Sequence, residues 1–265
     1  MSALPDGSTG DRVSEVLARL ALVNDPELDE SVTALGFVTG VTVDAAGRVG
    51  VGFRLPTYWC AANFAFLMAD DMRREIADLL WVTGIDIELG EHMYAETINR
   101  AVATGLSFKD TFAEEADGNL DEVRQVFAMK AFQRRQMALL DHLGRLGYEV
   151  ETLLGMSIAE LMAIEFASEG RALVSRYLER RNAPGAFGPG DRAFVDETGG
   201  AVAVEAYGAH RRALRRVTVN VEFNGALCRG LLAARYGEAD HTLSGEPTLL
   251  DFVRDHRPKA AAAPA

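Results

Sequence analysis

The sequence has 265 residues, of which 48% are hydrophobic and 25% are charged, as is ordinary for a globular protein of one large or two small domains. Its net charge of −12 disfavours binding to nucleic acid or to an anionic membrane, and no run of about 18 apolar residues could span a bilayer. The two cysteines, Cys60 and Cys228, form neither a C-x-x-C pair nor a disulfide framework. Because the start shows no signal-peptide pattern, we expect a cytoplasmic protein.

The first hundred residues predict a small mixed module. Residues 1–10 are rich in Gly, Ser and Pro, and we expect them to be disordered. Apolar residues at steps of three and four predict a helix over 13–23. Alternating apolar residues predict strands over 41–43 and 49–55, joined by a turn at 44–47, and then a helix over 61–80 and a strand over 85–89. This α-β-β-α-β order, assigned to residues 11–100, predicts a hairpin followed by a helical crossover to a parallel strand.

The remainder of the chain predicts helices and then strands. Residues 101–183 are expected to be helical, with a helical hairpin formed by residues 120–146 and 157–181; Ser157 and Glu160 form a capping-box pattern. A Gly- and Pro-containing break follows Asn182. Residues 184–257 are expected to be a small β-rich region with strands over 193–196, 201–206 and 217–223, and residues 258–265 a flexible tail. The predicted fold class is therefore α/β in the broad sense (α+β).

Cys60 is the residue with the strongest chemical potential in the predicted module. It lies where the second strand passes into a helix, in a loop stiffened and shielded by Pro56, Tyr58 and Trp59. Ligands of α/β units tend to bind beyond the carboxyl ends of strands, and a helix N-terminus favours the thiolate, the form that binds metal or attacks an electrophile. The alternative is that Cys60 is a small buried hydrophobe, which is also how we interpret Cys228.

Three segments in register resemble the SufT/PaaD-type family of iron–sulfur (metal-sulfur) cluster assembly factors: DPEL at 25–28, ALGFV at 34–38 and PTYWC at 56–60. The resemblance covers residues 11–90 and implies a key role for Cys60, with Asp25, Glu27 and Thr57 at matching positions. The aromatic pair before Cys60 departs from the small or glycine-containing loop of many relatives. The long extension after residue 100 makes the chain similar to accessory proteins of bacterial multicomponent diiron monooxygenases.

A metal at Cys60 needs further ligands, because one cysteine cannot hold a four-thiolate cluster or a structural zinc site. Asp25, Glu27, His92 and the Cys60 of a second subunit are the candidates. The expected cofactor is iron or an iron–sulfur cluster, bound transiently and in one arrangement bridged between the subunits of a homodimer. Asp25 before a proline also fits ordinary turn chemistry, and His92 also fits a solvated loop.

The predicted function is that of a non-catalytic maturation factor that assists delivery of iron or an iron–sulfur cluster to a client metalloenzyme. The resemblance implies the diiron hydroxylase of a multicomponent monooxygenase as that client, and no nucleic acid or membrane as partner. One alternative is a metal-free, client-binding folding chaperone or adaptor. Another is a hydrolase or transferase with Cys60 as nucleophile and His92 as base. No phosphate loop, H-E-x-x-H or E-x-x-H pattern occurs, so the sequence does not indicate a diiron enzyme.

Overall fold

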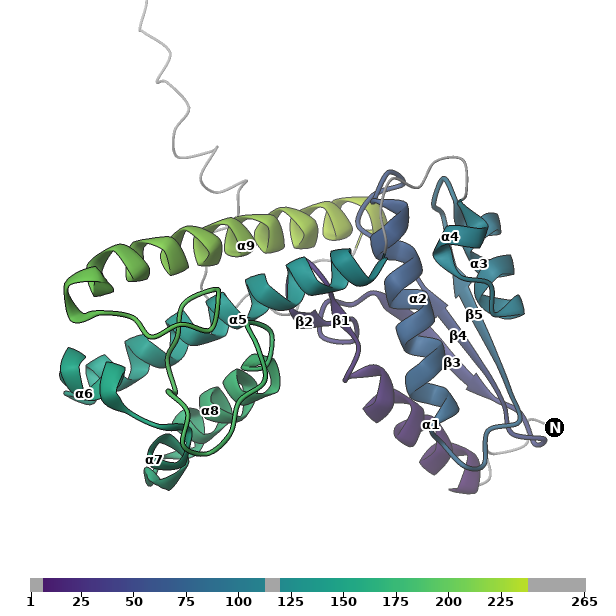
Figure 1. Ribbon diagram of the computed structural model, residues 1–265. Coiled ribbons are helices and arrows are strands. Elements are labelled where there is room, and N and C mark those ends of the chain that lie inside the picture. The colour runs from purple at the N-terminus through teal and green to yellow at the C-terminus, as the bar shows by residue number, and fades with distance from the viewer. Residues whose placement is uncertain (1–6, 113–119, 238–265) are drawn as a thin grey trace, which may run out of the picture. The chain divides into compact units, whose positions relative to one another are not determined.

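The computed structural model describes residues 7–112 and 120–237, and the chain divides into two compact units. Unit 1 comprises Met1–Val23, Ser31–Gly105 and Phe223–Ala265, and unit 2 comprises Asn24–Glu30 and Leu106–Glu222. Helices and a small sheet occur together, which confirms the predicted mixed fold class (Figure 1). Among the described residues, no helix is long and apolar enough to cross a membrane.

Unit 1 is built around a three-stranded sheet in the order β3-β4-β5. Strand β3 (Val38–Val43) pairs with β4 (Arg48–Phe53) in antiparallel fashion, and β4 pairs in parallel with β5 (Gly84–Leu89) after the crossover helix α2 (Ala62–Ala77). Helices α1 (Gly7–Leu20) and α3 (Ala95–Thr104) complete the module. The predicted hairpin and the parallel crossover are therefore confirmed.

Alternation along the strands gives the sheet one apolar and one open face. Val49, Val51 and Phe53 of β4 are buried, whereas Gly50 and Gly52 between them are only half-buried. Because successive side chains point to opposite faces, the buried set forms one face, which α1 and α2 cover (Figure 1). Burial of this face stabilises unit 1. Packing of the helices on the sheet holds β4 and β5 side by side, so that their carboxyl ends lie next to each other.

The prediction of disorder at the N-terminus is wrong for residues 7–10, which form the first turn of α1. Residues 1–6 and the predicted tail at 258–265 lie outside the described residues. Two short strands that the sequence did not indicate, β1 (Asn24–Asp25) and β2 (Glu30–Ser31), pair with each other between α1 and β3. Their two-residue length explains the omission, since no alternating pattern can develop over so few positions.

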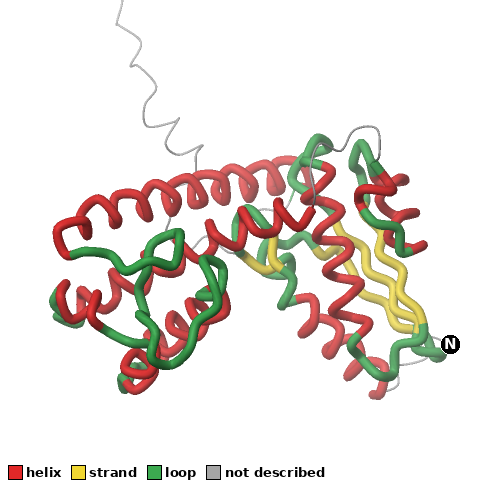
Figure 2. Tube along the Cα trace, viewed as in Figure 1, coloured by secondary structure: helices red, strands yellow, loops and turns green. Residues whose placement is uncertain are grey.

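Unit 2 is mainly helical (Figure 2). Helix α5 (Leu120–Arg145) agrees with the predicted apolar stripe and is followed by α6 (Val150–Gly155), α7 (Ile158–Ala163) and α8 (Ser168–Arg180); α4 (Phe108–Thr111) precedes it. The Ser157–Glu160 capping box is confirmed. The single predicted helix over 157–181 is instead two, because Ile164 leaves helical geometry and Phe166 is buried in the core between α7 and α8.

The predicted β-rich region is the main error in the secondary structure. Around residues 193–201 the described backbone forms isolated bridges, and a short 3₁₀ turn (Val204–Ala206) leads into the long helix α9 (Tyr207–Tyr236). The strand predicted over 217–223 is thus helical. Leu214 and Val221, two helical turns apart, are both buried, whereas Val219 and Phe223 are exposed. The alternating valines favour a strand only locally, and packing of one face of a long helix outweighs that local preference. Residues 238–257 lie outside the described part of the chain.

Candidate functional site

Cys60 lies in unit 1, in the loop between the carboxyl end of β4 and the first turn of α2. Ala61 is the N-cap residue of α2, and its carbonyl oxygen accepts hydrogen bonds from the amides of Phe64 and Ala65, both at 3.1 Å. No side chain caps this helix. Cys60 is half-buried and is a free thiol. The thiol therefore lies one residue before the N-cap of α2, beyond the carboxyl end of β4, as predicted from the sequence. Solvent can reach it.

The Thr57 hydroxyl lies within hydrogen-bonding distance of the thiol, with Oγ1 3.2 Å from Cys60 Sγ. The same oxygen accepts a hydrogen bond from the Trp59 amide at 3.2 Å. Since that bond uses a lone pair and leaves the hydroxyl proton free, Thr57 can donate to a Cys60 thiolate. Thr57 and Cys60, singled out together in the sequence, are thus brought into contact by a tight four-residue loop.

His92 follows β5 and is buried against the Cys60 loop. Its Nε2 lies 2.8 Å from the Cys60 carbonyl oxygen, and its Nδ1 accepts a hydrogen bond from the Tyr94 amide at 3.2 Å. Because Nδ1 is the acceptor, Nε2 carries the proton and donates. Burial lowers the pKa of His92 from its ordinary value, and the nearby Arg235 cation also lowers it, against the opposing effect of the bond to Cys60. Neutral His92 therefore joins two loops through their backbones.

This geometry bears on two roles predicted for His92. Coordination of a metal by either ring nitrogen would require breaking one of the two backbone hydrogen bonds. Action as a base toward the Cys60 thiol would require a ring nitrogen directed at Sγ, whereas Nε2 is directed at the carbonyl oxygen of the same residue. The ligand role stays a prediction, and the arrangement gives the nucleophile–base pair of a thiol hydrolase no support.

The end of α9 contributes side chains that the sequence gave no reason to place here. Arg235 donates to the carbonyl oxygen of Leu55 at 3.3 Å and to that of Glu91 at 2.7 Å, and it pairs with the Glu91 carboxylate at 3.1 Å. The neighbouring Tyr236 lies under the guanidinium of Arg54, 4.3 Å from the ring centroid. Leu55 opens the Cys60 loop and Glu91 precedes His92, so one guanidinium joins the bases of both loops.

Two aromatic side chains of the Cys60 loop are exposed to solvent. Trp59 is 71% exposed and Tyr58 44%, and their rings meet edge to face with centroids 5.0 Å apart. Met93, whose amide donates to the Tyr58 carbonyl at 3.1 Å, is 40% exposed. Large apolar side chains at the surface next to a reactive group are typical of places where proteins bind partners.

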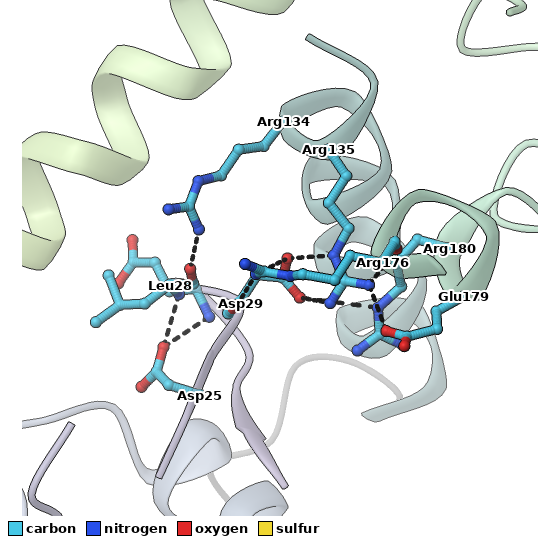
Figure 3. A network of polar contacts seen from close by, with 9 residues as sticks. Asp25, Leu28, Asp29, Arg134, Arg135, Arg176, Glu179 and Arg180 are labelled. Carbon is cyan, nitrogen blue, oxygen red and sulfur yellow. Dashed lines mark hydrogen bonds and ion pairs between the residues drawn. The ribbon is translucent and has the colours of Figure 1, made fainter. Parts of the chain in front are cut away.

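Asp25 and Glu27, the other predicted ligands, belong to unit 2. Asp25 is buried, and its Oδ1 accepts hydrogen bonds from the amides of Glu27 at 2.9 Å and Leu28 at 2.8 Å (Figure 3). Burial raises the pKa of Asp25 to about 6, although these two amide bonds act to lower it. The turn chemistry considered for Asp25 is therefore present. The metal-binding role of Asp25 and Glu27 stays a prediction.

The same segment carries a buried ion pair that sequence reasoning missed. Asp29 has φ of 52°, in the left-handed region, and its carboxylate receives two hydrogen bonds from Arg135 of α5, at 2.7 and 2.8 Å (Figure 3). Arg135 also binds Glu179 at 2.7 Å. Burial alone would lower the pKa of Arg135, but the charges and hydrogen bonds of Asp29 and Glu179 raise it. No local pattern signals a partner 106 residues away.

Among the described residues, no three His, Cys, Asp or Glu side chains converge in an arrangement that could hold a metal ion. The donors that the structure does bring together are the Cys60 thiol and the Thr57 hydroxyl.

Comparison with known proteins bears on the first part of the chain. Residues 14–87 match the family model described as iron-sulfur cluster assembly protein. The matched segment runs from α1 to β5 and includes Cys60, and it supports a role in iron–sulfur cluster assembly. No curated protein and no solved structure matches the chain. The finer SufT/PaaD assignment and the link to monooxygenases stay predictions.

Proposed function

We propose that this protein is a non-catalytic maturation factor in which the Cys60 thiolate takes up iron or an iron–sulfur cluster and passes it to a client metalloenzyme. The cargo is the substrate of this process and leaves the protein with the client. The observation that carries the proposal is the position of Cys60 in a family-matched segment: half-buried, one residue before the N-cap of α2, and 3.2 Å from a hydroxyl that can donate to a thiolate.

The surroundings of Cys60 suit a thiol that binds a metal and can still exchange it. The Thr57 hydroxyl lies within hydrogen-bonding distance of Sγ and can donate to a metal-binding thiolate. Partial exposure of Cys60 leaves room for an incoming metal. Such a site suits transfer better than storage, because a single thiolate does not enclose its cargo.

Completion of the metal's coordination is a further part of the proposal. One thiolate and one hydroxyl are too few ligands for iron or for a cluster. A second copy of this chain in a homodimer, or the apo-client itself, would supply the rest during transfer. The client that the extended architecture suggests is the diiron hydroxylase of a multicomponent monooxygenase, and cytoplasmic location follows from the same proposal.

A second candidate function is a metal-free chaperone or adaptor that binds the client without carrying iron. The exposed Trp59, Tyr58 and Met93 favour it, because they form an apolar surface that needs no metal to bind a partner. In that case Cys60 would serve only in packing. A thiol hydrolase has no such supporting observation, since His92 directs its proton to a backbone oxygen and away from Sγ.

The decisive experiment measures iron and sulfide content, with the absorption spectrum, after purification and reconstitution of the full chain without oxygen. Wild type is compared with Cys60→Ser, and Cys228→Ser is the matched control because Cys228 is the other half-buried cysteine outside a disulfide. We expect wild type and Cys228→Ser to bind iron and Cys60→Ser to lose it. The ratio of iron to sulfide then separates a cluster carrier from an iron donor.

Two results would contradict the proposal. Absence of iron from wild type as well as from Cys60→Ser would leave the chaperone as the better account. Equal iron in wild type and Cys60→Ser would place the cargo elsewhere. Activation of a purified apo-hydroxylase by wild type and by Cys60→Ser distinguishes the two candidate functions, because only the carrier requires the thiol.

A further inference from the structure

The loop that carries Cys60 is joined to the loop after β5 by a ladder of backbone contacts. Gly90 donates to the Phe53 carbonyl at 2.8 Å, the Met93 amide donates to Tyr58 at 3.1 Å, and His92 Nε2 donates to the Cys60 carbonyl at 2.8 Å. These contacts hold together the loop that follows β4 and the loop that follows β5, from the end of β4 to Cys60. They all lie within the segment from β4 to α3, and none comes from the C-terminal part of the chain.

Arg235 of α9 lies outside that segment, and its side chain bridges the same two loops. Its Nη1 donates to Leu55, and its Nη2 donates to both the carbonyl and the carboxylate of Glu91. The Arg235 side chain is only 20% exposed. A planar guanidinium can bind two carbonyl oxygens in different directions at once, which a lysine ammonium on a flexible stem does less well.

Neighbouring side chains fix the end of α9 in place. Tyr236 stacks under Arg54, and its hydroxyl lies 3.5 Å from the Leu55 carbonyl. One turn earlier, Leu232 is buried next to Gly36, which has φ of 69°; a Cβ at that position would lie 3.7 Å from a Leu232 methyl carbon. The helix then ends as Gly237, at φ of 66°, donates to the Ala233 carbonyl. Arg235 therefore reaches the loops from the packed last turn of α9.

We infer that Arg235 is a positioning residue that holds the Cys60 loop in the conformation needed to take up cargo. The inference rests on the proposed function and extends it to the C-terminal extension. Residues 14–87 supply the thiol, and a helix that begins 120 residues after the end of that match supplies the clamp on both loops that carry it. The extension is then part of the site as well as an addition to the family domain.

The test uses hydrogen–deuterium exchange of the full-length protein. Variants are Arg235→Ala, Arg235→Lys and, as a matched control, Arg216→Ala, because Arg216 is an exposed arginine on the same helix. We expect amides of residues 58–60 and 91–93 to exchange about tenfold faster in Arg235→Ala, as loss of a charge-assisted bridge predicts. The exchange rates of these amides in Arg235→Lys should lie between those of wild type and Arg235→Ala. In Arg216→Ala they should equal the wild-type rates.

The amides of β4 and β5 separate positioning from general stability. A role in positioning predicts unchanged exchange at Val49, Val51 and Ile87, whereas faster exchange throughout the sheet would mean that Arg235 only stabilises unit 1, and would overturn the inference. Unchanged exchange at residues 58–60 in both Arg235 variants would overturn it as well. If Arg235→Ala fails to fold, Arg235→Lys, which keeps the charge and most of the stem, provides the same comparison.

Iron affinity after anaerobic reconstitution is the second readout. We expect Arg235→Ala to bind iron at least about tenfold more weakly than wild type and than Arg216→Ala. Faster loop exchange with unchanged iron affinity would show that the clamp is not needed for cargo uptake, and would overturn the inference while the proposed function stands. Iron-free wild-type protein would instead refute the proposed function, and the exchange data would still decide whether Arg235 holds the loop.

Discussion

Replacement of Arg135 by methionine should destabilise the protein strongly, because it leaves the Asp29 carboxylate buried without its main partner. The side chains of Arg135 and Asp29 are 6% and 4% exposed and share two short hydrogen bonds. Removing one partner of such a pair costs about 3–5 kcal/mol. Arg180 at 3.8 Å and Arg176 at 4.0 Å from the Asp29 carboxylate compensate in part. We therefore expect a loss of about 3 kcal/mol in the free energy of unfolding.

The measurement is urea-induced unfolding followed by far-UV circular dichroism at fixed pH, with midpoint and slope both fitted. Arg145→Met is the matched control, since Arg145 is on the same helix and forms an ion pair of 3.9 Å with Glu169 in which both side chains are more than half exposed. Such exposed pairs contribute about 0–1 kcal/mol. The two variants change the same residue type in the same way, so their difference isolates burial.

A second substitution tests the cause. Adding Asp29→Gly to Arg135→Met removes the unpaired carboxylate and places glycine at a positive φ, which it adopts without strain. The double variant should recover at least about 1 kcal/mol relative to Arg135→Met alone. A loss below about 1 kcal/mol in Arg135→Met, or a double variant less stable than the single one, would refute the reasoning.

Two further predictions concern single positions. The pKa of Asp25 is raised to about 6 in the folded state from 3.8, so its contribution favours folding below pH of about 4 and is lost as pH rises toward 6. Asp25→Asn should therefore be more stable than wild type by about 1–2 kcal/mol at pH 7.5 and not at pH 4; thermal unfolding at both pH values checks this, and an equal difference at the two would contradict it. Gly47 has φ of 86°, and a Cβ there would lie 2.5 Å from the Trp81 carbonyl oxygen. Gly47→Ala should cost about 2 kcal/mol in urea unfolding, whereas Gly40→Ala, with nothing within 4 Å, should cost less than 1; equal losses would disprove the steric argument.

Local patterns predicted the elements that local chemistry decides. The turn after β3 contains Asp44 and Gly47, the latter at positive φ, and the alternation of Val49, Val51 and Phe53 places their side chains on the buried face. The capping box at Ser157 is equally local. In the candidate site, Thr57 and Cys60 are three positions apart in the sequence motif and are in contact in the structure. Each of these features depends on residues within a few positions of one another.

Features that depend on distant partners could not be predicted in this way. Helix α9 was expected to be partly strand, because Val217, Val219 and Val221 alternate with polar residues over too short a window to show the helical period. The bridge from Arg235 to Leu55 joins residues 180 positions apart, and nothing in the local sequence of either marks the other. The contact of His92 with the Cys60 backbone likewise depends on the parallel pairing of β4 and β5, which brings the loops after these strands together.

The interleaving of the two units has a consequence for how the chain folds during synthesis. Asp29 is translated early, but its partner Arg135 follows 106 residues later, and unit 1 receives its last described helix only with residues from Phe223 onward. Closure of such long loops carries an entropic cost and slows folding. Neither unit can therefore reach its final set of contacts on the ribosome before most of the polypeptide has emerged. A chain cut after β5 would retain the matched family segment but would carry Asp29 without Arg135 and the Cys60 loop without Arg235.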